Sequence, residues 1–321
     1  MTICVFDPGI EDNQGTLSSN LGDLVIQDAV TRELRAVFGD GEPLRISTQT
    51  RISAELMRRM RACTHRFVGG TNLLASKMRQ YRQWEISLVD AWRIDDAILL
   101  GVGWWDYQNN PDFYTRVVLR AALSRTAVHS VRDSYTLAKL RSIGFENVIN
   151  TGCPTMWPLA DLNPHAIPIE KADIALLMLT DYRPEPELDR RLFELLRASY
   201  SRVYFWPQGR ADLEYVRGLG LDCEMLDHSL PALDDFLRTS IGVDYVGTRL
   251  HGGVHCLLAG RRSLVLEVDN RAREIARDTG LPTTPRNDFD AIRQWIAGPT
   301  QVAITMNTGA IAAWRRQFAG G

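Results

Sequence analysis

Short apolar runs alternate with amphipathic segments along most of the chain. The apolar runs are rich in β-branched and aromatic residues and often end in glycine or a charged residue, which is typical of strands buried in a parallel sheet. The pattern predicts strands, several of them including the turn that ends the strand, over residues 2–6, 44–48, 65–72, 96–103, 126–131, 147–151, 173–180, 202–206, 223–226, 242–245 and 263–268.

The segments between these runs repeat apolar residues at helical spacing, which predicts amphipathic helices. Two of the helices have an N-cap candidate, Asp23 for the first and Ser134 for the third. The helices are expected over residues 24–38, 53–62, 135–142, 188–199, 213–219, 233–239 and 254–259, from 271 to 278, and in the tail around 311–318.

Strands that alternate with helices indicate an α/β protein with parallel sheets. The alternation stops at residues 157–172, where Pro158, Pro164 and Pro168 occur without clear periodicity, and then starts again. We interpret this stretch as a linker between two domains.

The predicted organisation is two Rossmann-like domains with parallel sheets that face each other across a cleft, as in the GT-B architecture. The active site is then expected in the cleft. The domains are predicted over 1–160 and 161–305, with a C-terminal helix over 306–321 that can pack back on the N-terminal domain.

The composition is that of an ordinary globular protein with nearly balanced charge. Apolar residues make up 45% of the 321 residues, and Lys plus Arg total 37 against 39 acidic residues. No overall field would therefore attract nucleic acid. No apolar run approaches the roughly 18 residues of a spanning helix, and no secretory leader is evident, so we expect a cytoplasmic protein.

The five cysteines are scattered, odd in number and form no CxxC pair. This pattern favours buried free thiols in a reducing compartment over disulfides. Cys153 precedes a proline and could be read as a nucleophile, but no nearby residue in the sequence looks like its base, so a buried thiol is the preferred interpretation.

The stretch from Gly242 to Val268 predicts a strand, a tight turn, a short helix and a second strand, which together form a βαβ unit. Ligands of open parallel sheets bind outside the carboxyl ends of the strands. Arg249 and His251 fall at that place. Gly252 and Gly253 are expected to leave the first helical turn bare, so that its N–H groups can approach an anion.

The loop between the first strand and the first helix, residues 7–23, is rich in glycine, serine and asparagine. A glycine-bearing loop between strand and helix is the layout that binds phosphate groups. The spacing is not GxGxxG, however, and on this stretch alone an ordinary helix capped by Asp23 is preferred.

Five short motifs follow one another along the chain: Asn20-Leu21-Gly22-Asp23, Gly69-Gly70-Thr71-Asn72-Leu73, Val131-Arg132-Asp133, Thr151-Gly152-Cys153-Pro154-Thr155 and Gly247-Thr248-Arg249-Leu250-His251-Gly252. In this order they resemble the motifs of the polysaccharide pyruvyltransferases. The resemblance extends from Asn20 to about Pro282, with one departure: Asp269-Asn270-Arg271 stands where many members have Asp-Pro followed by lysine. Arg271 keeps the positive charge. The resemblance implies that domain 1–160 is the acceptor side and domain 161–305 the donor side.

This resemblance implies transfer of a pyruvyl group from phosphoenolpyruvate to two sugar hydroxyls, which gives a ketal and phosphate. The donor is doubly anionic, its vinyl carbon must gain a proton, and its phosphate must leave. Arg249 would hold the phosphate or carboxylate, His251 would supply or relay the proton, and Arg132 would complete the catalytic set. No metal or cofactor is required.

The resemblance also implies which other residues form the site. Donor binding is assigned to Arg249, Leu250, Gly252, Gly253, Asn270 and Arg271. The cleft or acceptor side is assigned to Asn20, Asp23, Gly70, Asn72 and Trp105. The acceptor is expected to be a saccharide or glycolipid precursor, recognised by loops such as 7–19 and 108–114. A lipid-linked acceptor would bring the protein to the inner face of the membrane.

Several of these residues have a purely structural alternative. Arg249 can be an ion-pair partner, His251 a helix cap, and Arg132 a local salt bridge to Asp133. Arg271 can belong to a solvated face. His251 and His255 lie four residues apart, which raises zinc, but no third ligand is evident and packing of His255 in the sheet is preferred.

Two other functions remain open at the level of sequence. One is a GT-B glycosyltransferase that uses a sugar nucleotide, in which Arg249 would bind a diphosphate. The other is a two-domain protein that binds a ligand without turnover. Stabilisation by a nucleoside diphosphate but not by phosphoenolpyruvate would favour the first of these.

Overall fold

In a computed structural model of the protein, which describes residues 2–163 and 166–319, the chain forms two compact units. The first unit consists of residues 1–18, 23–157 and 306–321, and the second of residues 19–22 and 158–305. Pro164 of the predicted linker, and residues 1, 320 and 321 at the ends of the predicted domains, lie outside the described residues.

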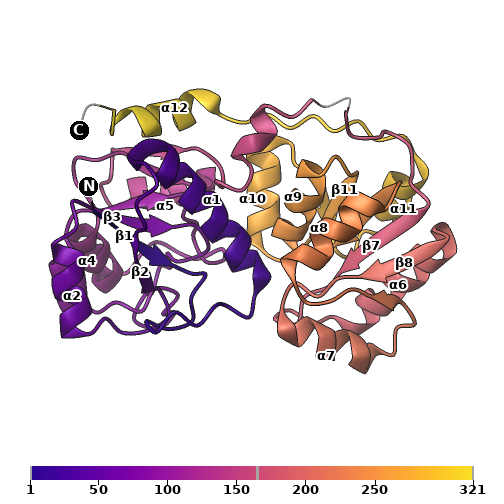
Figure 1. The fold of residues 1–321 in the computed structure, drawn as a ribbon, viewed down its shortest axis with the longest axis horizontal. Coiled ribbons are helices and arrows are strands. Elements are labelled where there is room, and N and C mark those ends of the chain that lie inside the picture. Colours follow the sequence, from indigo (N-terminus) through magenta and orange to yellow (C-terminus); the bar gives the residue numbers. More distant parts are fainter. Residues whose placement is uncertain (1, 164–165, 320–321) are drawn as a thin grey trace. The chain divides into compact units, whose positions relative to one another are not determined.

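The first unit is built on parallel strands (Figure 1). Four of them pair in the order β2-β1-β3-β4, and β5 pairs with β6. A parallel bridge between Val102 and Val131 continues the order from β4 to β5. β2 lies on one side of β1, and the order runs from β3 onwards on the other side. The switch point of this sheet therefore lies between β1 and β3. The strands are β1 (Ile3–Asp7), β2 (Leu44–Ser47), β3 (His65–Gly69), β4 (Ala97–Leu100), β5 (His129–Val131) and β6 (Val148–Asn150).

The core of the first unit is apolar and includes the fully buried side chains of Phe6, Trp84 and Trp104. α3 and α4 were not predicted, because α3 is only seven residues long and α4 ends in extended backbone at Leu123 without a glycine stop. The helices are α1 (Leu21–Phe38), α2 (Ala54–Arg61), α3 (Leu88–Ile94), α4 (Phe113–Ala122), α5 (Ser134–Arg141) and α12 (Thr308–Arg316).

The C-terminal helix α12 belongs to the first unit. Its Trp314 is fully buried and meets the ring of Phe67 edge-on, with the centroids 6.1 Å apart. Arg315 forms an ion pair with Glu33 of α1. These contacts attach α12 to β3 and α1.

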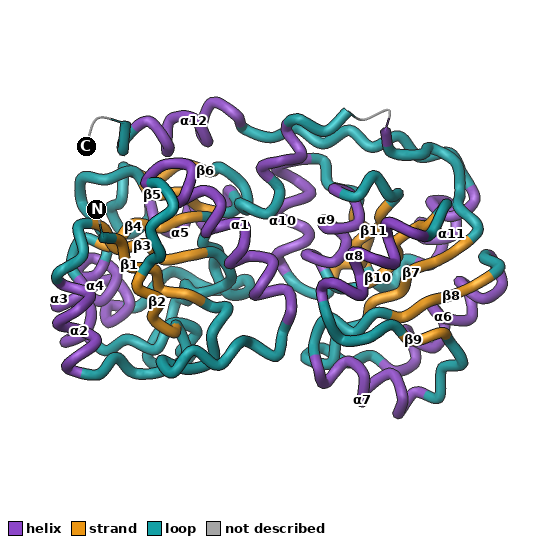
Figure 2. The backbone as a smooth tube through the Cα atoms, in the orientation of Figure 1, coloured by secondary structure: helices purple, strands orange, loops and turns teal. Residues whose placement is uncertain are grey.

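The second unit has a six-stranded parallel sheet in the order β12-β11-β10-β7-β8-β9. This is the Rossmann order, in which the strand order across the sheet reverses between the first and fourth strands, here β7 and β10 (Figure 2). The strands are β7 (Ile174–Met178), β8 (Arg202–Phe205), β9 (Glu224–Met225), β10 (Val243–Gly247), β11 (Ser263–Glu267) and β12 (Thr283–Pro285).

The helices of the second unit alternate with these strands, apart from a short 3₁₀ helix, η1, at the unit boundary. β12 and α11 were not predicted, since the three residues of β12 include a proline and give no periodic signal. The helices are η1 (Trp157–Ala160), α6 (Pro186–Ser199), α7 (Arg210–Leu219), α8 (Leu230–Thr239), α9 (Leu250–Leu258), α10 (Asn270–Thr279) and α11 (Phe289–Ala297).

Both predicted N-caps are wrong. α1 begins at Leu21, so Asp23 lies inside its first turn, and Asn20 Oδ1 accepts the N–H of Gly22 at 3.1 Å. The cap of α5 is Asp133, whose Oδ1 accepts the N–H of Thr136 at 2.7 Å, and Ser134 is the first helical residue. In each case the sequence offered two residues of cap-forming type close together, Asn20 and Asp23 for α1 and Asp133 and Ser134 for α5.

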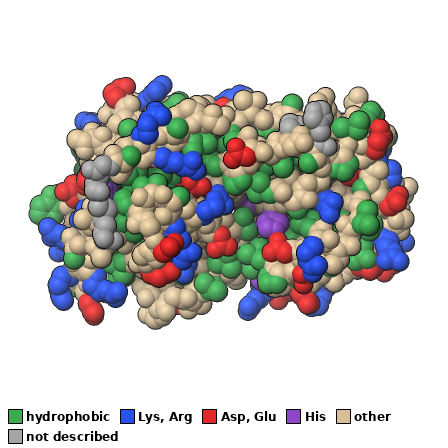
Figure 3. Space-filling view, turned by 45° about the horizontal axis from the view of Figure 1, so that its top comes forward, with side chains coloured by type: hydrophobic (Ala, Val, Ile, Leu, Met, Phe, Trp, Pro, Cys, Tyr) green, Lys and Arg blue, Asp and Glu red, His purple; other side chains and the backbone are tan. Residues whose placement is uncertain are grey.

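On the face shown in Figure 3, Lys and Arg side chains are interspersed with Asp and Glu side chains. None of the helices in the described part of the chain is long and apolar enough to span a bilayer. All five cysteines are free thiols, and Cys153 is buried with a raised pKa, chiefly because of desolvation.

The buried ring of His129 on β5 contacts the backbone of two other segments, at Leu99 of β4 and at Ser124. Its Nδ1 accepts the N–H of Leu99 at 3.2 Å, and its Nε2 lies 2.8 Å from the carbonyl oxygen of Ser124. This arrangement requires a neutral ring with its proton on Nε2. Burial lowers the pKa of His129 to about 4.

We expect His129 to make stability depend on pH. The unfolded state binds the proton with a pKa of 6.5 and the folded state only near 4, so the contribution of His129 is fully present above pH 6.5 and is lost as the pH falls towards 4. The loss should amount to about 3 kcal/mol in the free energy of unfolding. Imidazole ¹⁵N shifts measure the midpoint directly, and a midpoint near 6.5 would contradict this assignment.

Candidate functional site

The candidate site of the second unit lies at the carboxyl ends of β7 and β10, the switch point of its sheet. Arg249 lies in the turn after β10, as the N-cap residue of α9, and has 5% of its surface exposed. Its Nε donates to Asp212 Oδ2 at 2.9 Å, and its Nη2 donates to both Asp212 Oδ1 and Asp181 Oδ1, the latter at 3.1 Å. The hydroxyl of Tyr245 donates to the Arg249 carbonyl at 2.7 Å. The guanidinium is thus held in one orientation by two carboxylates.

Asp212 is fully buried at the start of α7 and accepts from more than Arg249. The backbone N–H groups of Gly209 and Asp181 also donate to it, at 2.7 and 3.0 Å. Burial raises the pKa of the Asp212 carboxyl, and the Arg249 guanidinium opposes that rise. The pair joins the end of β10 to the beginning of α7.

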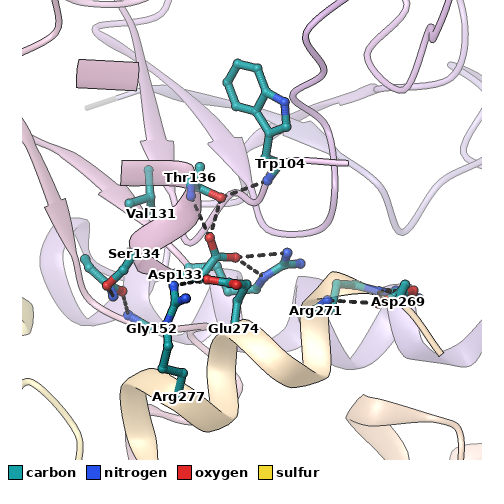
Figure 4. Close-up of polar contacts among 12 residues, drawn as sticks. Trp104, Val131, Asp133, Ser134, Thr136, Gly152, Asp269, Arg271, Glu274 and Arg277 are labelled. Atoms are coloured by element: carbon teal, nitrogen blue, oxygen red, sulfur yellow. Dashed lines mark hydrogen bonds and ion pairs between the residues drawn. The ribbon is translucent and has the colours of Figure 1, made fainter. Parts of the chain in front are cut away.

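Arg271 is also engaged by a carboxylate. Its Nε lies 2.9 Å from Asp269 Oδ2, and Asp269 caps α10 (Figure 4). The ring of Tyr182 lies between the two arginines, 5.1 Å from the Arg249 guanidinium and 5.4 Å from that of Arg271. Three carboxylates therefore accompany two guanidinium groups here, which supports the ion-pair alternative for Arg249.

The prediction that Gly252 and Gly253 leave bare N–H groups is wrong. The N–H of Gly252 donates to Gln208 Oε1 at 3.1 Å, and that of Gly253 donates to the Arg249 carbonyl at 3.0 Å. A Cβ on Gly252 would lie 2.2 Å from Met178 Sδ. The glycines let α9 pack closely against β7 and β11, as the third glycine of Rossmann turns does.

The N-terminal motif reaches this region of the second unit through Gln208. Asn20 Oδ1 accepts from Gln208 Nε2 at 3.2 Å, and the N–H of Leu21 donates to the Gln208 carbonyl at 2.8 Å. Gln208 in turn accepts from Gly252. A Cβ on Gly22 would lie 2.4 Å from Gln208 Nε2, which explains the glycine of this motif. Residues 19–22 therefore belong to the second unit and not to the predicted N-terminal domain.

The two histidines of α9 have different surroundings. His251 lies in the first turn with 5% of its surface exposed, next to the buried Leu250. His255 does not pack in the sheet as predicted, because its Nε2 pairs with Asp234 of α8 at 2.6 Å. Within residues 2–163 and 166–319, no group of three or more His, Cys, Asp or Glu side chains could hold a metal ion.

The candidate site of the first unit centres on Arg132 at the end of β5. Arg132 is 1% exposed, and its Nε donates to Asp133 Oδ2 at 3.2 Å. Its Nη2 lies 3.2 Å from the same oxygen, but no well-directed hydrogen bond reaches it from any described residue. A Cβ on Gly103 would lie 2.2 Å from this nitrogen, so the guanidinium packs directly on the glycine backbone.

Asp133 is fixed by helix α5 (Figure 4). Its Oδ1 accepts both the N–H and the hydroxyl of Thr136 at 2.7 Å, and the Thr136 hydroxyl oxygen accepts the N–H of Trp104 at 2.9 Å. The helix cap thereby sets the position of the carboxylate that orients Arg132. The local salt bridge to Asp133 therefore leaves the buried Nη2 of Arg132 with hydrogen-bonding capacity.

The turn after β3 lies beside this arginine in the first unit. Gly70 and Thr71 both have positive φ, 44° and 57°, and a β-branched residue in that region is strained. The Thr71 carbonyl accepts the N–H of Gly103 at 2.8 Å. Asn72 Oδ1 is buried without a hydrogen-bond partner among the described residues. A ligand atom would satisfy it.

The other two predicted cleft residues lie in the first unit. Trp105 is half-buried and meets the ring of Tyr81 at 4.5 Å between centroids. Asp23 accepts from the hydroxyl of Ser18 at 3.1 Å. Asn270, predicted for the donor side, is a buried residue at the start of α10 in the second unit.

Sequence reasoning missed Gln208, Asp181, Tyr182 and Asp212. The first three lie in the loops that follow β8 and β7, and that position was a usable signal. Asp212 resembles any acidic residue of a first helical turn, and only the fold brings it to Arg249.

Comparison with known proteins identifies the family of the chain and shows solved structures with a similar fold. The family model described as "Polysaccharide pyruvyl transferase" matches residues 20–270. Among curated proteins, no sequence matches the chain significantly.

Several solved structures are similar to the chain. Among them is a co-structure of S. aureus MnaA with UDP, at 11% identity and a TM-score of 0.54, covering 92% of this chain and 88% of that one. Another is a UDP-GlcNAc 2-epimerase from Neisseria meningitidis bound to UDP-GlcNAc, at 12% identity and a TM-score of 0.46, covering 99% of this chain and 94% of that one. The parallel α/β units are of the GT-B-like type that was predicted.

We expect Gly253→Ala to destabilise the protein by about 1–3 kcal/mol, because the new Cβ would lie 2.6 Å from Val265 Cγ2. The matched control is Gly218→Ala in α7, where a Cβ meets nothing within 4 Å and helix propensity predicts a gain of up to about 1 kcal/mol. Urea unfolding of both variants measures the difference. Equal effects would show that Gly253 is not a packing residue.

A double-mutant cycle separates the structural role of Arg249 from a binding role. Arg249→Gln should cost about 3–5 kcal/mol, because Asp212 is left buried without its cation. Adding Asp212→Asn removes that charge and should restore at least half of the loss, as measured by urea unfolding. If the double variant is no more stable than the single one, the pair is not the stabilising contact described here.

Proposed function

Because the chain belongs to the polysaccharide pyruvyl transferase family, we propose that it transfers a pyruvyl group from phosphoenolpyruvate to two hydroxyls of a saccharide, forming a ketal. The observation that carries this proposal is the family match over residues 20–270. Its motifs end at the carboxyl edges of both sheets, where α/β proteins bind their ligands. The enzyme would need no cofactor.

The reaction balances without a further reactant. The vinyl carbon of phosphoenolpyruvate gains a proton and becomes a methyl group, and one acceptor hydroxyl adds to the neighbouring carbon. The C–O bond to phosphate then breaks, and the second hydroxyl takes its place. The two hydroxyl groups release two protons in all. One replaces the proton taken up by the new methyl group, and the other is carried by the released phosphate.

Arg132 is the arginine that we assign to the donor's negative charge. It is buried beside a single carboxylate, Asp133, and its Nη2 has hydrogen-bonding capacity left. The N–H groups of this nitrogen can donate to a phosphate or carboxylate oxygen without moving, which favours a transition state in which charge develops on the leaving group.

Arg249 receives a changed role in this proposal. Its Nε and Nη2 are engaged by Asp212 and Asp181, so a donor would have to share a guanidinium that is already neutralised. We propose that Arg249 fixes the turn that carries His251, while His251 supplies the proton to the vinyl carbon. Arg271, paired with Asp269, is a supporting cation.

Melting temperatures with added ligands test the alternative of a glycosyltransferase that uses a sugar nucleotide. The UDP in the MnaA structure belongs to that protein, and a likeness at 11% identity concerns the fold alone. Phosphoenolpyruvate should raise the melting temperature of this protein, and UDP should not. Stabilisation by UDP alone would favour a glycosyltransferase instead.

We expect purified protein to release phosphate from phosphoenolpyruvate only when a saccharide acceptor is present. Arg132→Gln should lower kcat/KM for phosphoenolpyruvate by at least about 100-fold, because an oriented cation is lost from the transition state. His251→Gln should lower kcat by about 10²–10⁴-fold through loss of the proton donor. A coupled phosphate assay and NMR detection of the ketal methyl group provide the measurement.

Arg238→Gln is the matched control, since this side chain is 72% exposed and pairs with Asp235 on the surface of α8. Its activity should equal that of the unmodified protein. Full activity of both Arg132→Gln and His251→Gln, with unchanged melting temperatures, would remove the proposed mechanism.

A further inference from the structure

A hollow of about 380 Å³ lies in the first unit, within the usual size range of ligand pockets. Its lining comes from two loops, one after β3 and one after β4, which are adjacent parallel strands. We call it the amide pocket. It is lined by Ser76, Lys77, Tyr81, Tyr107, Gln108, Asn109 and Asn110.

The loop after β4 is fixed by hydrogen bonds from two side chains of α5, Lys139 and Tyr135. Lys139 Nζ, on a side chain that is largely buried, donates to the carbonyl oxygens of Gln108 and Asn109 at 2.5 and 3.0 Å. The Tyr135 hydroxyl accepts the N–H of Gln108 at 2.8 Å and donates to its carbonyl at 3.0 Å. The loop is therefore ordered before any ligand arrives, which lowers the entropic cost of binding.

This fixation also directs the remaining polar groups. In a trans peptide the N–H points opposite to the C=O, so the N–H groups of Asn109 and Asn110 point away from Lys139. Neither N–H group, and neither side-chain amide, makes a hydrogen bond within the described part of the chain. Each amide offers both donors and an acceptor to a ligand.

The lining matches one class of ligand. Lys77 is its only charged side chain, so a phosphate or diphosphate would lack the several cations it needs. Tyr107 is 45% exposed, and Tyr81 packs on Trp105, which provides apolar ring faces. Amides beside aromatic rings suit a molecule with many hydroxyl groups on an apolar ring.

We propose that the amide pocket binds a neutral pyranose residue of the acceptor saccharide, an inference that rests on the proposed function. The pocket is joined to the site around Arg132 by Trp104. The Trp104 indole N–H donates to Ser76 Oγ at 3.2 Å, and its backbone N–H donates to Thr136, which bonds to Asp133. A sugar in the pocket is thus positioned relative to Arg132 by a rigid chain of contacts.

The test measures binding directly, without donor. Methyl β-glucopyranoside, methyl β-galactopyranoside and methyl α-mannopyranoside are titrated into ¹⁵N-labelled protein, with methyl β-glucuronide and inorganic phosphate as charged probes. At least one neutral glycoside should shift the amide signals of residues 76–81 and 107–110. The charged probes should shift them less.

Variants of exposed lining residues locate the site. Asn110→Ala and Lys77→Gln should each weaken glycoside binding at least fivefold and raise KM for the acceptor by a similar factor, with KM for phosphoenolpyruvate unchanged. Asn287→Ala and Trp92→Ala, both exposed and outside the pocket, are the matched controls and should change neither.

The outcomes separate this inference from the proposed function. Glycoside shifts in the pocket without phosphate release for any acceptor would keep the pocket and overturn the transferase. Transfer with an unchanged acceptor KM in both lining variants would keep the transferase and overturn the pocket. Absence of shifts with every neutral glycoside, or stronger shifts with the glucuronide or phosphate, would also overturn the pocket.

Discussion

The buried contact between Arg249 and Asp212 is the interaction on which the second unit's site depends. It joins the end of β10 to the beginning of α7, across the switch point of the sheet. Both groups are removed from water, so the pair persists only because neighbouring N–H groups and Asp181 satisfy their remaining capacity. The turn that carries His251 takes its position from this contact.

In the first unit, a helix cap orients the buried arginine of the site. Asp133 caps α5 through Thr136 and at the same time holds Arg132, so the orientation of the arginine follows from the start of the helix. Gly103 provides the space in which the guanidinium lies. The difference between the sites is electrostatic: carboxylates outnumber guanidinium groups around Arg249, whereas Arg132 faces a single carboxylate and keeps a nitrogen available.

Glycines near both sites serve packing more than anion binding. Gly252 and Gly253 allow α9 to contact Met178 and Val265, and Gly22 makes room for Gln208. The N–H groups of Gly252 and Gly253 are used within the protein. A glycine-rich motif after a strand can therefore reflect close contact between helix and strand, and the available binding groups can lie elsewhere, as in the amide pocket.

The sequence by itself determined the α/β class, most of the strands, and the placing of Arg249, His251 and Arg132 at strand ends, because strand–helix alternation and local turn chemistry are encoded over short distances. Only the tertiary structure decided which groups meet. Asp212 lies 37 positions from Arg249 along the chain, and Gln208 lies 188 from Asn20. Such pairings depend on strand order, which no local pattern contains. The charge state and available hydrogen bonds of each candidate residue depend on it as well.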